Sequence, residues 1–206
     1  MDVKEGYSMI ASITKSARLL ERCRIFLAAI GIVCICLLAV WGSNTCHASI
    51  PLASDSAKDV GEKVGLLVTA DTAVEGTVTD LIRMAEFDRD IHGEHWDAYA
   101  HRYTSGKYSA ISVYFDNPSG QIASIMILTD DMGDDAYLKA VLPFVVYSLK
   151  SIHLSETEIK SMASQSLKKS LVAVNCVATN RKISLLKFEH ESGTPAKMTY
   201  HIMTVD

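Results

Sequence analysis

The feature that most constrains this chain is an uncharged apolar run near its N-terminus. Residues 25–42 read IFLAAIGIVCICLLAVWG and contain no charged side chain. As a helix, the run would be about 27 Å long, close to the thickness of the hydrocarbon layer of a bilayer. A helix on the surface of a soluble domain normally keeps one polar face, which this run lacks. The run therefore predicts a signal peptide or a membrane anchor.

Charges on the two sides of the run predict its orientation. Lys15, Arg18, Arg22 and Arg24 precede it, and no lysine or arginine follows it until Lys58. Positive residues stay on the cytoplasmic side of a membrane segment, so the N-terminus should remain inside the cell. The rest of the chain is then exported, either secreted or held in the periplasm or at the cell surface.

Two fates of the exported chain remain open. Cys46-His47-Ala48 puts small residues at positions −3 and −1 of a signal-peptidase site, which would make residues 1–48 a cleavable signal. The apolar run is longer than an ordinary signal core, which favours an uncleaved anchor holding the protein in the membrane through residues 25–42. After cleavage the chain keeps only Cys176, so a disulfide framework is excluded for the exported part.

Composition excludes several classes of protein. Nearly half of the 206 residues (49%) are hydrophobic, which is typical of a globular chain and not of a disordered one. The formal net charge of −4 lacks the basic excess that nucleic-acid binding requires. We therefore expect no nucleic-acid partner.

Patterning divides the exported part into a tether and a domain. Residues 49–75 are mostly small and polar, and we interpret them as a tether. Residues 76–206 are expected to form a single domain. Within it, Val78, Leu81, Ile82 and Ala85 repeat at helical spacing and predict a short helix over 78–87.

A β-meander is the clearest pattern in the domain. Residues 95–104 alternate loosely, and 107–115 and 121–129 predict two further strands, separated by the turn signals Ser105-Gly106 and DNPSG at 116–120. The third strand is apolar on both faces. It should therefore be central in the sheet or covered on both sides.

Helices and a terminal hairpin follow the meander. Residues 135–152 predict a buried helix that Pro143 kinks or divides, and the Ser155–Glu158 capping box begins a helix over 156–172. Strands are expected over 182–189 and 197–205. The predicted fold is α+β, a mainly antiparallel β-meander plus a C-terminal hairpin covered by two or three helices.

One segment carries a candidate metal site. Residues 88–101 hold His92, His95 and His101 together with Asp88, Asp90, Glu94 and Asp97. Imidazole and carboxylate are zinc ligands, and one helical turn would bring His92 and His95 together. Gly93 and the strand that follows oppose that helical turn, so solvated loop and edge-strand side chains are the competing interpretation.

Three other groups are weaker candidates. Asp130, Asp131, Asp134 and Asp135 resemble a calcium loop but lack its order, and they also suit the start of a helix. Cys176 would need His153, His190 or His201 as a base to act as a nucleophile; otherwise it is an inert small hydrophobe. An aromatic binding surface could form on the meander from four tyrosines, Tyr99, Tyr103, Tyr108 and Tyr114.

Two functional hypotheses follow. The first is a non-enzymatic envelope or secreted domain that binds an envelope protein or a ligand through its sheet. The alternative is a metal-dependent hydrolase that uses His92 and His95 with a nearby carboxylate. The sequence predicts no cofactor and holds no G-x-S-x-G motif or glycine-rich phosphate loop.

Overall fold

A computed structural model describes residues 50–84, 89–91, 94–190 and 196–205, with only the backbone described at 89–91 and 94–96. The fold is α+β, with an eight-stranded antiparallel sheet ordered β1-β5-β6-β7-β10-β9-β8 and with β2 also paired to β5. Its strands are β1 (Thr77–Val78), β2 (Ile82–Arg83), β5 (Ala98–Ser105), β6 (Tyr108–Asp116), β7 (Ile122–Thr129), β8 (Leu171–Cys176), β9 (Arg181–Glu189) and β10 (Met198–Thr204). A separate hairpin pairs β3 (Arg89–Ile91) with β4 (Glu94–Trp96).

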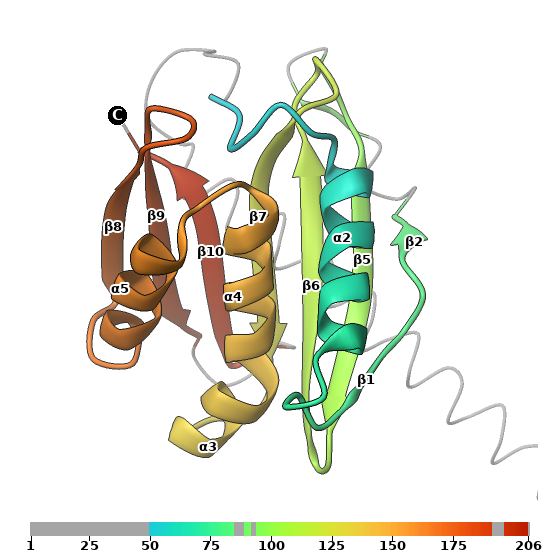
Figure 1. The fold of residues 1–206 in the computed structure, drawn as a ribbon. Helices are drawn as coiled ribbons and strands as arrows, with labels where there is room; N and C mark the ends of the chain where they lie inside the picture. The colour runs from blue at the N-terminus through green and yellow to red at the C-terminus, as the bar shows by residue number, and fades with distance from the viewer. Residues whose placement is uncertain (1–49, 85–88, 92–93, 191–195, 206) are drawn as a thin grey trace, which may run out of the picture. The chain divides into compact units, whose positions relative to one another are not determined.

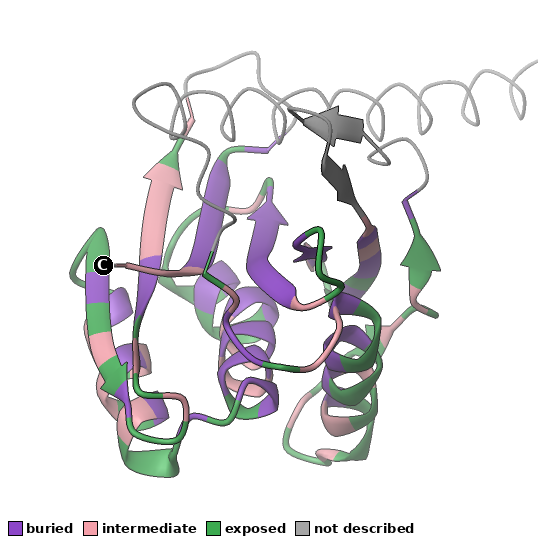
Figure 2. Cartoon of the chain, turned by 90° about the horizontal axis from the view of Figure 1, so that it is seen from above, coloured by how far each residue is buried: buried purple, intermediate pink, exposed green. Residues whose placement is uncertain are grey.

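Three helices cover one face of the large sheet (Figures 1 and 2). Helix α2 (Ala57–Ala70) lies over β5 and β6, and α4 (Leu142–Ser151) lies over β7. Helix α5 (Glu156–Ser166) lies over β8 and β9. Two short elements, α3 (Asp134–Ala136) and the π-helix η2 (Tyr137–Val141), lead directly into α4. The hydrophobic core fills the space between the helices and the sheet.

The predicted meander and C-terminal hairpin are confirmed, except that the first strand begins at Ala98, because residues 95 and 96 belong to β4 of the separate hairpin. Strands β5, β6 and β7 pair in sequence, and β10 pairs with both β7 and β9. The first turn is tight because Ser105 pairs directly with Tyr108, and Gly106 takes a positive φ of 57°. In the second turn the Asn117 side chain accepts hydrogen bonds from the N–H groups of Ser119 and Gln121.

Strand β7 is central, as its apolar pattern predicts. All eight of its residues are buried, with β6 on one side and β10 on the other. Ile125 and Ile127 belong to the core under the helices, and Met126 and Leu128 on the opposite face are buried as well. A strand with no exposed face reads as a continuous apolar run, which explains the pattern.

Residues 57–70, which the sequence analysis assigns to a tether, form helix α2 instead. Its buried stripe is Ala57, Val60, Val64 and Val68 at a spacing of three or four residues. Small residues let the helix lie close to the sheet, since a Cβ at position 61 would be 3.2 Å from the Tyr114 ring. Three valines form most of this face, and valine favours strands over helices, so the helix is inconspicuous in the sequence.

Residues 50–56, here called the N-terminal strap, are bound to one end of the sheet. The N–H of Leu52 donates to the carbonyl of Ile122 (2.7 Å), and the N–H of Ile122 donates to the carbonyl of Asp55 (2.8 Å). The Thr204 hydroxyl donates to the carbonyl of Ile50, and Arg181 donates to the carbonyl of Pro51. The strap is therefore an ordered part of the domain.

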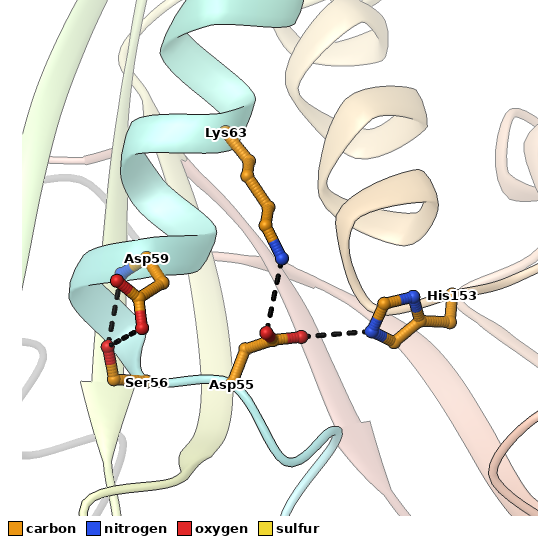
Figure 3. A network of polar contacts seen from close by, with 5 residues as sticks. All are labelled: Asp55, Ser56, Asp59, Lys63 and His153. Carbon is orange, nitrogen blue, oxygen red and sulfur yellow. Dashed lines mark hydrogen bonds and ion pairs between the residues drawn. The ribbon is translucent and has the colours of Figure 1, made fainter.

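A polar network fixes the end of the strap to two helices (Figure 3). The Asp55 carboxylate accepts from Lys63 on α2 at 3.1 Å and lies 2.9 Å from Nε2 of His153, just beyond α4. Burial works against the ionised carboxylate, but the bonds to His153 and Lys63 outweigh it, and the pKa of Asp55 is lowered. Ser56 caps α2 by accepting from the N–H of Asp59.

Two helices predicted from the sequence differ from the structure. In the described part of the helix expected over 78–87, β1 and β2 pair with the edge of β5, because the spacing of Val78 and Ile82 also suits short edge strands; residues 85–87 lie outside the described residues. The second predicted helix ends at Ser166, and β8 begins at Leu171 and pairs with β9. The capping box is confirmed, as is the division near Pro143, since α4 begins at Leu142.

No helix in the described part of the chain is long and apolar enough to span a bilayer. The apolar run 25–42 and the candidate cleavage site at Ala48 lie outside the described residues.

Candidate binding pocket

A hollow of about 310 Å³ opens beside the C-terminal end of α2. Three walls form it: the loop 71–75 after α2, the end of β5, and the consecutive elements η2 and α4. The lining residues are Asp71, Ala73, Val74, Glu75, Tyr103, Ser105, Leu138, Lys139, Leu142, Pro143, Val146 and Tyr147. A volume of this size suits a small ligand or one side chain of a partner.

The wall formed by η2 is an unusual element. A π-helix is rare and is frequently found at functional sites. Here the N–H of Leu142 donates to the carbonyl of Tyr137, and Pro143 has no N–H with which to continue the ladder. Tyr137, Ala140 and Val141 remain buried, so the widened turn places Leu138 and Lys139 at the pocket. Leu138 keeps 46% of its surface exposed.

Part of the pocket lining is apolar and is here called the floor, and the polar part is called the rim. Val74, Leu142 and Val146 are partly buried side chains that pack against the main core, and Pro143 lies next to them. A ligand that covers these groups would remove apolar surface from water, which is the main favourable term in binding small molecules.

The polar rim combines two carboxylates with two phenols. The Tyr147 hydroxyl donates to the Asp71 carboxylate, which also accepts from the N–H of Ala73 at 2.9 Å. The bond from Tyr147 lowers the pKa of Asp71, while burial and the facing carboxylate raise the pKa of Tyr147 to about 12. Asp71 is therefore ionised, and Tyr147 is a stable donor.

The second phenol fixes the loop from the other side. The Tyr103 hydroxyl donates to the carbonyl of Glu75 at 3.0 Å, and burial raises the pKa of Tyr103. The next residue, Gly76, lies so close to this ring that an added Cβ would be 2.4 Å from it. Because Gly76 has no side chain, the loop can lie against the Tyr103 ring, and the hydrogen bond from Tyr103 then fixes the backbone of Glu75.

Among the described residues that line the pocket, Lys139 is the one lysine or arginine. Its ammonium nitrogen lies 5.8 Å from the centre of the Tyr108 ring, and that of Lys107 lies 5.1 Å from the same ring. Tyr108 is not among the lining residues. The charged side chains at the hollow are therefore Asp71 and Glu75 of loop 71–75 together with Lys139.

The histidine-rich segment is only partly described. The backbones of β3 and β4 pair as a hairpin in which Asp90 is opposite His95, instead of the helical turn that would bring His92 and His95 together. Asp88 and His92 lie outside the described residues, as do the side chains of Asp90, Glu94 and His95. Within the described residues, no group of three or more His, Cys, Asp or Glu side chains could hold a metal ion.

His101, the third histidine of that segment, is a core residue. It is 3% exposed, its Nε2 lies 2.8 Å from the Tyr114 hydroxyl, and its ring stacks on Phe144 at 4.9 Å. Burial lowers the pKa of His101 to about 4. His101 is therefore a neutral core residue that packs against Phe144 and Tyr114. Asp97, also in the segment, pairs with Arg83.

The four meander tyrosines do not make an open aromatic surface. Cross-strand pairing puts all of them on the face that the helices cover. Tyr103 and Tyr114 are 1% and 0% exposed, and Tyr99 and Tyr108 are half-buried. The expected sheet-face site is therefore wrong for Tyr103 and Tyr114, because alternation in a strand does not reveal which face the helices cover.

The remaining candidates have structural roles. Cys176 is buried, and its Sγ lies 3.9 Å from the carbonyl oxygen of His153, whose ring is bound to Asp55. His190 pairs with Thr199, and His201 is buried. Asp131 accepts from the N–H of Ser109, and α3 begins at Asp134, as the helix-start interpretation predicts.

The chain matches no protein-family model, no curated protein and no solved structure. Function is therefore inferred from the chemistry of the pocket. Sequence patterning missed this pocket because loop 71–75 and the residues before Pro143 come together only in the folded chain. The one local feature of the sequence near the pocket was Pro143, which predicted an interruption of the helix.

Proposed function

We propose that this protein is an exported, non-enzymatic binding domain and that its ligand site is the pocket between loop 71–75, β5 and η2–α4. Export is supported by the apolar run 25–42 and by the basic residues that precede it. Envelope or extracellular ligands, or a protein partner, would then reach the pocket from solution.

The observation that carries the proposal is the composition of the pocket. Val74, Leu142 and Val146 form an apolar floor, and Asp71 and Tyr147 form a fixed polar pair at its rim. Apolar floors with a few positioned polar groups are typical of ligand sites, where the apolar area gives affinity and the polar groups give orientation.

A fragment screen by NMR tests the proposal. The full chain is kept in detergent micelles, and fragments are screened against wild type and a Val146→Trp variant whose indole fills the hollow. Leu66→Trp is the matched control, because Leu66 is 71% exposed on α2 and does not line the pocket. We expect fragments to shift resonances of the lining residues in wild type and control but not in Val146→Trp.

Two outcomes of the screen would contradict the proposal. Fragments that bind Val146→Trp as well as wild type would place binding elsewhere. A screen with no fragment at the lining residues would show that the hollow is not a ligand site.

A further inference from the structure

We propose that the pocket selects organic cations, that is, an ammonium group carried on an apolar body. This inference rests on the proposed function, since it takes the pocket to be the ligand site and names the chemistry of the ligand. The cation would be placed at Asp71 and Glu75, with the apolar body on Val74, Leu142 and Val146.

Asp71 is arranged to accept a further hydrogen bond. One of its carboxylate oxygens accepts from Tyr147 and the other from the N–H of Ala73, which together fix the orientation of the group. Each carboxylate oxygen can accept two hydrogen bonds, so one acceptor position remains on each oxygen. Hydrogen bonds between an ammonium group and an ionised carboxylate are among the stronger ones in proteins.

The other groups at the rim favour the same sign of charge. Glu75, a second carboxylate, also lines the pocket, and its negative charge adds to the raised pKa of Tyr103, whose main cause is burial. The Tyr147 ring also lines the pocket and is partly exposed, and an aromatic ring can attract a cation placed over its face. Two carboxylates and one partly exposed aromatic ring thus line one small space.

An anionic ligand would meet the opposite arrangement. Among the described lining residues, Lys139 is the one with a positive charge, against the two negative charges of Asp71 and Glu75. Lys150 attracts Asp71 weakly but does not line the pocket. A carboxylate or phosphate in the hollow would therefore meet two negative charges and one positive charge, which disfavours it relative to a cation.

Three probes that share one apolar body test the charge preference: 2-phenylethylammonium, 2-phenylethanol and 3-phenylpropionate. Affinities are measured by NMR titration of the full chain in uncharged detergent, using resonances of the lining residues. We expect the cation to bind about tenfold more tightly than the alcohol, and the anion more weakly than either.

Conservative variants identify the groups responsible. Asp71→Asn keeps an oxygen for Ala73 or Tyr147 but removes the charge, and it should reduce the affinity for the cation about tenfold while that for the alcohol stays the same. Glu75→Gln should have a smaller effect in the same direction. Asp80→Asn is the matched control, because Asp80 is exposed and does not line the pocket.

A peptide arm distinguishes two sources of the cation. Tighter binding of acetyl-Leu-Lys-Leu-amide than of 2-phenylethylammonium would identify a lysine side chain of a protein partner, and the reverse a free amine. Equal binding of the alcohol and the cation, a preference for the anion, or an unchanged affinity in Asp71→Asn would each overturn the inference. Those outcomes would contradict the preference for cations but not the proposed function. If no probe and no fragment bound at the pocket, both the proposed function and the preference for cations would be wrong.

Discussion

The carboxylate of Asp116, at the end of β6, accepts a hydrogen bond from the backbone N–H of Ala57, the first residue of α2. An N–H in the first turn of a helix has no partner within the helix, and Ala57 is fully buried. Asp116→Ala leaves this donor unpaired. We expect it to lower the free energy of unfolding by about 1–3 kcal/mol, measured by urea denaturation.

Glu62→Ala is the control for that substitution. Glu62 lies on the same helix in an exposed pair with Lys58, and its loss should cost less than about 0.5 kcal/mol. Equal urea midpoints for Asp116→Ala and Glu62→Ala would show that the bond to Ala57 contributes nothing to stability.

The pH dependence of stability should carry opposite contributions from His101 and Asp116. The pKa of His101 is lowered to about 4, so its contribution is fully present above its ordinary value near 6.5 and is lost as the pH falls towards 4. Burial raises the pKa of Asp116 to about 6, so the folded state holds its proton more firmly and this contribution is lost as the pH rises from 4 through 6.

Two variants separate these contributions. Urea unfolding between pH 4 and pH 7 should show that His101→Gln loses less stability on acidification than wild type, by up to roughly 3 kcal/mol. Asp116→Asn should lose more stability on acidification than wild type, since it removes a group that stabilises the folded state at low pH. Profiles parallel to wild type would show that neither group is coupled to folding.

Sequence patterning located the sheet better than the site. The apolar run of β7 and the tight turns around Gly106 and Gly120 are local signals, so the meander could be predicted. Helix α2 was missed because three valines, which favour strands, form most of its buried face. The close approach at Gly61 depends on the Tyr114 ring, which lies far away in the chain.

The site was missed for a similar reason. Asp71 and Tyr147 are 76 residues apart and become a pair only when α2 and α4 pack together. The tyrosines of β5 and β6 gave a visible pattern, but the pattern cannot say which face of a strand the helices will cover.

Ile125→Asp tests the centre of the sheet. Ile125 is fully buried in β7, and an unpaired carboxylate there should lower the free energy of unfolding by about 3–5 kcal/mol, measured by thermal and urea unfolding. Leu171→Asp is the matched control, because Leu171 lies on edge strand β8 and is 54% exposed. If Ile125→Asp melted at the same temperature as wild type, β7 would not lie in the core.

The leader prediction concerns processing of the chain. If signal peptidase cuts after Ala48, the mature protein begins at Ser49, and Ala48→Trp should leave a larger, membrane-bound form because the pocket for position −1 accepts only small side chains. Cell fractionation and N-terminal sequencing check this. An intact wild-type chain in membranes indicates an anchor, and recovery of the full chain from the cytosol contradicts export.

Elemental analysis addresses the alternative metal-dependent hydrolase. Protein purified without a histidine tag should hold no stoichiometric zinc or manganese, because the backbone at β3 and β4 forms a hairpin and not a helical turn. Bound metal that disappears in both His92→Ala and His95→Ala would support the hydrolase instead.

The N-terminal strap sets the distance between the domain and a bilayer. Because residues 50–56 are bound to the sheet, a chain that keeps residues 25–42 in the membrane has only residues 43–49 as a spacer, with a reach of at most about 25 Å. Helix α2 begins at the strap and ends at Ala70, so the pocket lies at the opposite end of a helix about 21 Å long. In an anchored form, the attachment to the membrane would thus enter the domain at the end of α2 that lies away from the pocket.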